Sequence, residues 1–119
     1  MPTNADHFAL VVGIDDYPKF KSLAGAKQDA KDFAKWLADD EMGGGVPNDN
    51  LKLILSKKNP TRPIHDDIDA ALDEIFEATD NIRAERLYFF FAGHGLARSN
   101  FGADLCLATW SKRRMGLAL

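Results

Sequence analysis

One histidine, His94, stands between Gly93 and Gly95 directly after a run of five apolar or aromatic residues, Leu87 to Phe91. Such a run is typical of a strand buried on both faces of a parallel sheet. Open α/β sheets bind substrates just past the carboxyl ends of their strands, where glycines let the backbone approach a ligand closely. Neutral imidazole is also the usual general base near pH 7. The pattern predicts a catalytic base at position 94; the alternative is a turn whose histidine caps backbone groups.

The elements that must position this histidine alternate between strands and helices. Residues 8–14 form a second apolar run, and residues 51–55 alternate in part, which indicates a strand nearer a sheet edge. Helical spacing of apolar residues predicts helices near 24–42 and 63–79. Strand–helix–strand connections are right-handed. We therefore predict an α/β fold with a mainly parallel sheet, in which the first strand lies between 51–55 and 86–92 and the helices cover opposite faces.

Four large apolar residues of the two helices share the spacing of a buried stripe. We expect all of them to face the sheet: Phe33, Leu37, Leu72 and Phe76. A last, short extended segment is predicted at 105–109.

Composition limits the classes of function. The chain has 119 residues, a net charge of −3 with both signs interspersed, and a single cysteine. No basic patch indicates nucleic-acid binding, and one cysteine excludes an intramolecular disulfide and fits a reducing compartment. No apolar run reaches membrane-spanning length, and the polar amino terminus lacks the regions of a signal peptide. We expect one cytoplasmic domain that binds neither nucleic acid nor membrane.

Three blocks of sequence, taken in order and spacing, resemble a known family. They are Ala9–Tyr17, Leu23–Ala30 and Phe89–Gly95. Together they resemble the amino-terminal part of a caspase-type peptidase domain, closest in style to metacaspases and bacterial caspase-like proteins, and the resemblance spans about residues 8–110. It implies a caspase-like three-layer α/β/α fold with a mainly parallel sheet. Residues 1–119 would form a single, partial domain that lacks the later strands.

The resemblance also implies roles for individual residues in a Cys/His cysteine endopeptidase. His94 is the general base, and the backbone N–H of Gly95 helps to form the oxyanion hole. Asp29 matches a carboxylate in the metacaspase specificity pocket, which favours lysine or arginine before the cut bond; equally, an acid in the first turn of a helix is stabilising without any ligand. Asp16 and Tyr17 are expected to line the same edge and, with Asp29, to bind a peptide or protein substrate.

The nucleophile is where the chain departs from the family. The family's catalytic cysteine ends a strand tens of residues beyond the histidine, whereas Cys106 follows His94 by only 12 residues, in an apolar segment. An apolar setting raises the pKa of a thiol, so we interpret Cys106 as structural. The chain alone is expected to be inactive, and a chain segment that completes the sheet is expected among its partners. The resemblance implies acidic calcium ligands in loops downstream of the histidine, but this chain has Trp110 and Ser111 there, so we assign no metal. We also assign no cofactor.

Two other hypotheses remain open from the sequence. The first is a non-catalytic caspase homologue that acts as a binding or regulatory module through its open sheet edge. The second is an unrelated doubly wound domain that binds a nucleotide or flavin. The first strand–helix turn lacks the Gly-x-Gly-x-x-Gly pattern of such a domain, and its loop is long.

Overall fold

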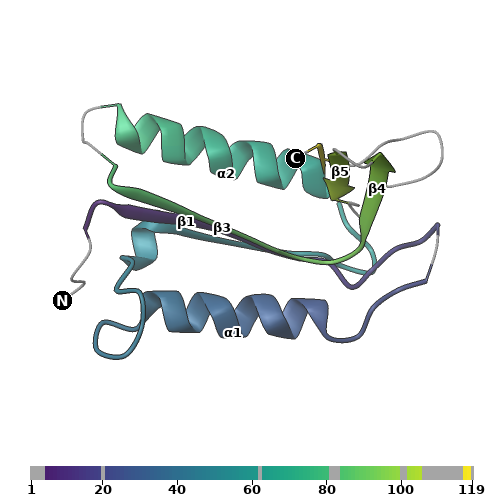
Figure 1. Ribbon diagram of the computed structural model, residues 1–119, viewed down its shortest axis with the longest axis horizontal. Coiled ribbons are helices and arrows are strands. Elements are labelled where there is room, and N and C mark those ends of the chain that lie inside the picture. Colours follow the sequence, from purple (N-terminus) through teal and green to yellow (C-terminus); the bar gives the residue numbers. More distant parts are fainter. Residues whose placement is uncertain are drawn as a thin grey trace.

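A three-stranded parallel sheet lies between two helices (Figure 1). The computed structural model describes residues 5–19, 21–61, 63–80, 84–99, 102–105 and 117–118. The sheet has the order β2-β1-β3, and its elements are β1 (His7–Gly13), α1 (Ala26–Ala38), β2 (Leu51–Leu55), α2 (Ile64–Thr79) and β3 (Arg86–Ala92), with a short 3₁₀ helix (Asn48–Asn50) before β2. The predicted parallel pairing, with the first strand in the middle, is therefore confirmed.

The central strand β1 is buried on both faces, as its apolar run predicted. Successive side chains of a strand point to opposite faces, so β1 divides the interior into two clusters. Phe8, Leu10 and Val12 pack with residues of α2, whereas Ala9 and Val11 pack with residues of α1. The two helices therefore cover opposite faces, as expected from the right-handed connections (Figure 1).

Helix α1 is shorter than predicted at both ends. It lies close to β1 because alanines occupy most of its buried face and because Gly13 has no side chain. A Cβ on Gly13 would come within 2.7 Å of the Ala30 Cβ. The helix stops at Ala38 because Asp39 has an extended backbone. Its carboxylate accepts the N–H groups of Glu41 and Met42, which closes a turn and lowers the pKa of Asp39.

Helix α2 packs over β1 and β2, and one of its predicted contacts is wrong. Its buried stripe is Ile64, Ile68, Ala71 and Ile75, with Leu72 partly buried beside it. Phe76 was expected to face the sheet but is 58% exposed. The correct stripe follows the i, i+4, i+7, i+11 spacing from Ile64, and Phe76 lies about 100° around the helix from Ile75.

The histidine strand β3 is not buried on both faces, which corrects a second prediction. Tyr88 and Phe90 pack against the α1 side, but Leu87 is 48% and Phe89 is 46% exposed on the other side. The cause is the position of α2 over β1 and β2. Within the described residues β3 has a neighbouring strand on one side only, so the expected open edge is present.

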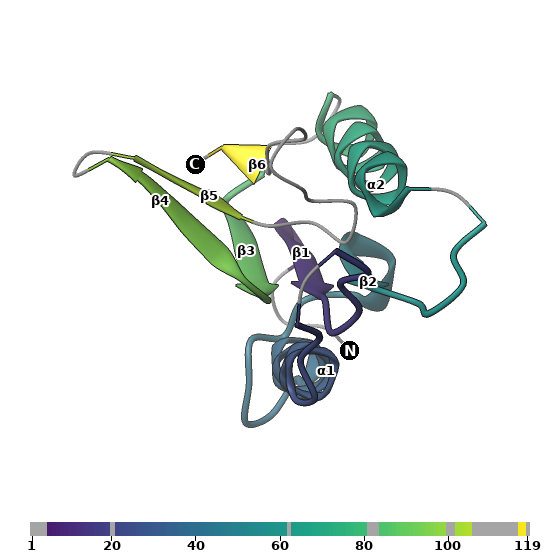
Figure 2. The same cartoon turned by 90° about the vertical axis from the view of Figure 1, so that its right-hand side faces the viewer.

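A second, small antiparallel sheet follows β3. Its strands are β4 (Gly95–Ser99), β5 (Gly102–Leu105) and β6 (Leu117–Ala118), and β4 and β5 form an arm that extends away from the parallel sheet (Figure 2). The extended segment predicted at 105–109 overlaps β5 only at Leu105, and Cys106 lies outside the described residues. In the part of the chain described, no helix is long and apolar enough to cross a bilayer.

Candidate active site around His94

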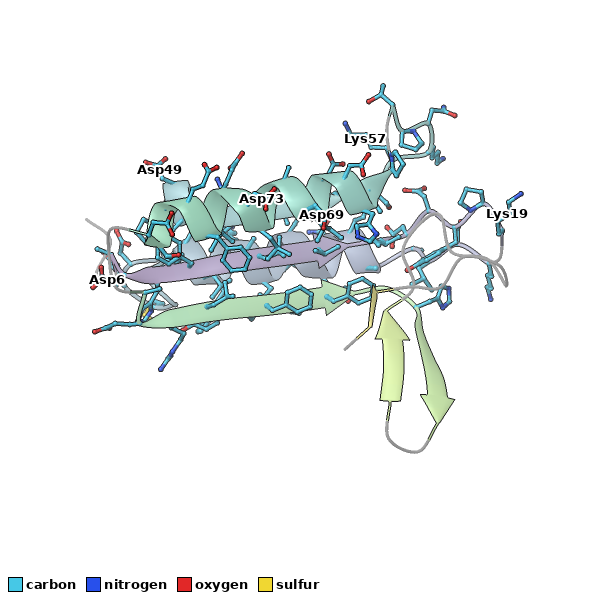
Figure 3. All side chains as sticks on the ribbon, turned by 90° about the horizontal axis from the view of Figure 1, so that it is seen from above. Asp6, Lys19, Asp49, Lys57, Asp69 and Asp73 are labelled. Carbon is cyan, nitrogen blue, oxygen red and sulfur yellow. The ribbon has the colours of Figure 1, made fainter. Side chains whose placement is uncertain are left out.

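The carboxyl ends of the three parallel strands meet at one edge, and three loops leave from it. Gly13 is level with Ala92 of β3 and Leu55 of β2 in the strand register. The β1 exit loop, residues 14–19 and 21–25, therefore lies beside the loop that carries His94. In Figure 3, Lys19 of this exit loop lies beyond the arrowheads of β1 and β3, whereas Asp6 lies at the opposite end of the sheet.

His94 is half-buried and is held by two residues of the β1 exit loop. Its backbone N–H donates to the Tyr17 hydroxyl at 2.9 Å, and the two rings meet at 66° with centroids 4.7 Å apart. Its imidazole Nε2 lies 2.9 Å from the carbonyl oxygen of Lys21. A carbonyl only accepts hydrogen bonds, so this contact assigns the proton to Nε2 and the lone pair of the neutral ring to Nδ1.

Gly93 is required by space, and the group that occupies the space is Tyr17. A Cβ at position 93 would lie 2.6 Å from the Tyr17 hydroxyl oxygen and 2.8 Å from Cζ of Phe91. The Gly93 backbone therefore approaches another group closely, but this group is the Tyr17 side chain and not a ligand. The Gly93 backbone is not in the left-handed region.

The β1 exit loop is itself fixed at several points. The Tyr17 N–H donates to the Ser22 hydroxyl at 3.1 Å, and the Leu23 N–H donates to the Asp15 carbonyl at 2.7 Å. The Asp15 carboxylate accepts the Ala26 N–H at 2.8 Å, at the start of α1, where Gly25 has no side chain to cap the helix. These bonds tie the loop that holds His94 to the first turn of α1.

Asp16 lies at the same edge of the sheet but is turned toward β2. Its carboxylate accepts the Ser56 hydroxyl at 2.7 Å and lies 3.5 Å from the Lys27 ammonium. Ser56 is buried just after β2 and in turn accepts the N–H groups of Asp15 and Asp16. His94 follows β3, on the other side of β1. The Asp16 side chain therefore points toward Ser56 and not toward His94. Its hydrogen bond with Ser56 connects the loop after β1 to the loop after β2.

Asp29 is exposed in the first turn of α1, on the side of the helix that faces β3. Phe33, one turn further along the same face, stacks on Phe90 of β3 with ring centroids 4.6 Å apart. Asp29 therefore lies at the carboxyl edge of the sheet on the His94 side. Gly95 is the first residue of β4 and pairs with Leu105.

The described residues hold a positioned histidine and no thiol, whereas acyl transfer by a Cys/His pair needs both groups. The Lys21 carbonyl and the Tyr17 hydroxyl were not predicted as contacts of His94. The Lys21 contact could not be predicted, because every residue has a backbone carbonyl. The tyrosine after the first strand is a weak sequence signal for a contact with His94. Among the residues the structure describes, no three His, Cys, Asp or Glu side chains are grouped to hold a metal ion.

Comparisons with known proteins identify one family. The family model for the caspase domain, Peptidase C14, matches residues 6–114. This match covers both helices and every described strand except β6. No match was found among curated proteins or among solved structures.

Proposed function

Because this chain belongs to the caspase domain family, we propose that it is the histidine-bearing part of a metacaspase-type cysteine endopeptidase domain. The observation that carries the proposal is the contact between the Lys21 carbonyl and Nε2 of His94. This contact gives a neutral histidine the tautomer that a general base needs, at the sheet edge where substrates bind. We propose that residues 1–119 form one partial domain, and the single cysteine supports a cytoplasmic location.

In the proposed reaction, Nδ1 of His94 takes the proton of a cysteine thiol. The thiolate attacks the carbonyl carbon of the scissile peptide bond, and the backbone N–H of Gly95 donates to the oxygen that becomes negative. The protonated imidazole then gives its proton to the leaving amine, and water hydrolyses the thioester with His94 again as base. The Lys21 carbonyl stabilises the imidazolium that forms in each half of the cycle, because it accepts a hydrogen bond from Nε2–H throughout.

The nucleophile in this proposal comes from a segment outside these 119 residues. Cys106 stands only 12 residues after His94, and its sequence neighbours Leu105 and Leu107 are apolar; an apolar neighbourhood disfavours a thiolate. The open edge of β3, with Leu87 and Phe89 exposed beside it, is where such a segment would add a strand to the sheet. Strand addition there would bring the new segment next to the His94 loop.

The proposed substrate is a peptide or protein with lysine or arginine before the cut bond. Asp29 supports this preference because its carboxylate is exposed at the His94 side of the sheet edge and can pair with a basic side chain. Its position in the first turn of α1 stabilises the helix as well, so the two roles are compatible.

A peptidase assay tests the proposal in two steps. The chain alone, and its Cys106→Ala variant, are expected not to cleave peptides that contain lysine or arginine. Activity that disappears in Cys106→Ala would identify Cys106 as the nucleophile and overturn the proposed source of the thiol. Mixed with a segment that carries the family's nucleophilic cysteine, the chain is expected to cleave. Asp29→Asn should then reduce the preference for basic residues, whereas Asp32→Asn, an exposed acid of the same helix, should not.

A non-catalytic homologue is the second candidate, and the exposed face of β3 favours it. Leu87 and Phe89 offer an apolar surface next to an open backbone edge, which suits a binding module without any chemistry. Stable binding of the added segment without peptide hydrolysis would support this candidate over the peptidase.

A further inference from the structure

We infer that Tyr17 is a positioning residue that fixes His94 for its role as a base. The inference rests on the proposed function for its purpose, but its geometry stands independently. Tyr17 is 2% exposed, so its side chain has little surface with which to contact a peptide. It lies instead against the backbone and the ring of His94.

The hydrogen bond fixes the backbone of His94 at the point where the strand ladder stops. The last bond described at this end of the β1–β3 pair joins the Ile14 N–H to the Ala92 carbonyl at 2.9 Å. Two residues later the chain turns into β4, and the Tyr17 hydroxyl receives the His94 N–H at 2.9 Å. A backbone N–H at such a turn needs an acceptor, and Tyr17 supplies it from across the sheet edge.

The ring contact fixes the direction of the imidazole. The T-shaped arrangement, with centroids 4.7 Å apart, is a favourable geometry for two aromatic rings. The carbonyl of Lys21, four residues after Tyr17 in the same loop, accepts a hydrogen bond from Nε2–H of His94. The Tyr17 N–H donates to the hydroxyl of Ser22, the residue after Lys21, and this bond keeps Tyr17 and Lys21 at a fixed spacing. One loop therefore holds the backbone, the ring face and the ring nitrogen of His94.

The substitution Tyr17→Phe isolates the hydroxyl, because the ring and its packing remain. We expect hydrogen exchange of the His94 backbone N–H to become about fivefold faster, the change that the loss of a typical net hydrogen bond supports. The imidazole should also lose part of its Nε2–H tautomer, which ¹⁵N NMR of the ring reads directly. Tyr88→Phe is the matched control, since the Tyr88 hydroxyl bonds Arg86 at the other end of β3.

Both readouts use the chain itself and need no peptidase activity, so this inference can fail while the proposed function stands. Unchanged exchange and an unchanged tautomer ratio in a folded Tyr17→Phe protein would overturn it. If Tyr17→Phe does not fold, Ser22→Ala releases the same loop from outside the core. The tautomer ratio of Ser22→Ala should then move in the same direction, and an unchanged ratio would equally overturn the inference.

Discussion

Removing the carboxylate of Asp15 should destabilise the protein, because this side chain closes the amino terminus of α1 from a distance. The first N–H groups of a helix have no partner within the helix, and Gly25 at the cap position offers no side chain. Asp15 accepts the N–H of Ala26 at 2.8 Å and lies 3.4 Å from the N–H of Lys27. Its negative charge also lies at the positive end of the helix dipole.

The magnitude follows from these contacts. A hydrogen bond to a charged group contributes about 1.5–3 kcal/mol, and a charge at the helix start adds about 0.3–1 kcal/mol. We count only the bond to Ala26, because the contact to Lys27 is long. Asp15→Ala should therefore lower the free energy of unfolding by about 2–4 kcal/mol. Asp15→Asn keeps a neutral acceptor and should cost about 1–2 kcal/mol.

Urea unfolding followed by circular dichroism measures both free energies. The midpoint should fall without a change in slope, because the surface exposed on unfolding is the same. Asp32→Ala is the control: this acid is exposed on the same helix and accepts a hydrogen bond from the exposed Gln28 amide, so its loss should cost less than about 0.5 kcal/mol. If Asp15→Ala costs no more than Asp32→Ala, the interpretation of Asp15 as a helix cap is wrong.

Three further predictions concern the core, pH and the open face. Leu10→Ala, in the fully buried central strand, should lower the free energy of unfolding by about 2–5 kcal/mol, and Leu53→Ala, in the partly exposed edge strand, by much less; urea unfolding measures both. The N–H groups of Glu41 and Met42 lower the pKa of Asp39 in the folded protein. The Asp39 carboxylate therefore stabilises the fold above its ordinary pKa, and this stabilisation is lost as the pH falls through its lower pKa in the folded state. Asp39→Ala should reduce the drop in urea midpoint on acidification. Phe89→Lys should reduce self-association in sedimentation without loss of thermal stability, and greater self-association would contradict the open face.

Much of the architecture could be predicted because it depends on patterns that lie within the sequence. The apolar run around Leu10 predicted a central strand, and helical spacing predicted that Leu37 lies on the face of α1 that packs on it. Phe76 was misplaced because apolar residues of α2 occupy more than one face, and spacing alone does not say which one meets the sheet. The exposure of Phe89 was missed because an apolar run looks the same whether its second face is covered or open.

The surroundings of His94 were predictable only in part. Its place after a strand, between glycines, followed from residue types. Two of its contacts did not: one is with the main-chain carbonyl of Lys21, which any residue provides, and the other is with the buried hydroxyl of Tyr17. Asp16 was predicted to bind substrate because it stands on the right loop, and its bond to Ser56 depends on tertiary structure that spacing cannot reveal.

The most direct test of the central claim, that His94 is the base of a cysteine peptidase, is the kcat of the domain reconstituted with a nucleophile-bearing segment. His94→Ala should lower kcat by about 100-fold or more, the usual contribution of a general base. The control is His65→Ala, because His65 is an exposed histidine of α2, the helix over β1 and β2, and its ring lies 3.5 Å from the Asp69 carboxylate. Only His94→Ala should lose activity. Activity that survives His94→Ala, or that falls equally in His65→Ala, would contradict it.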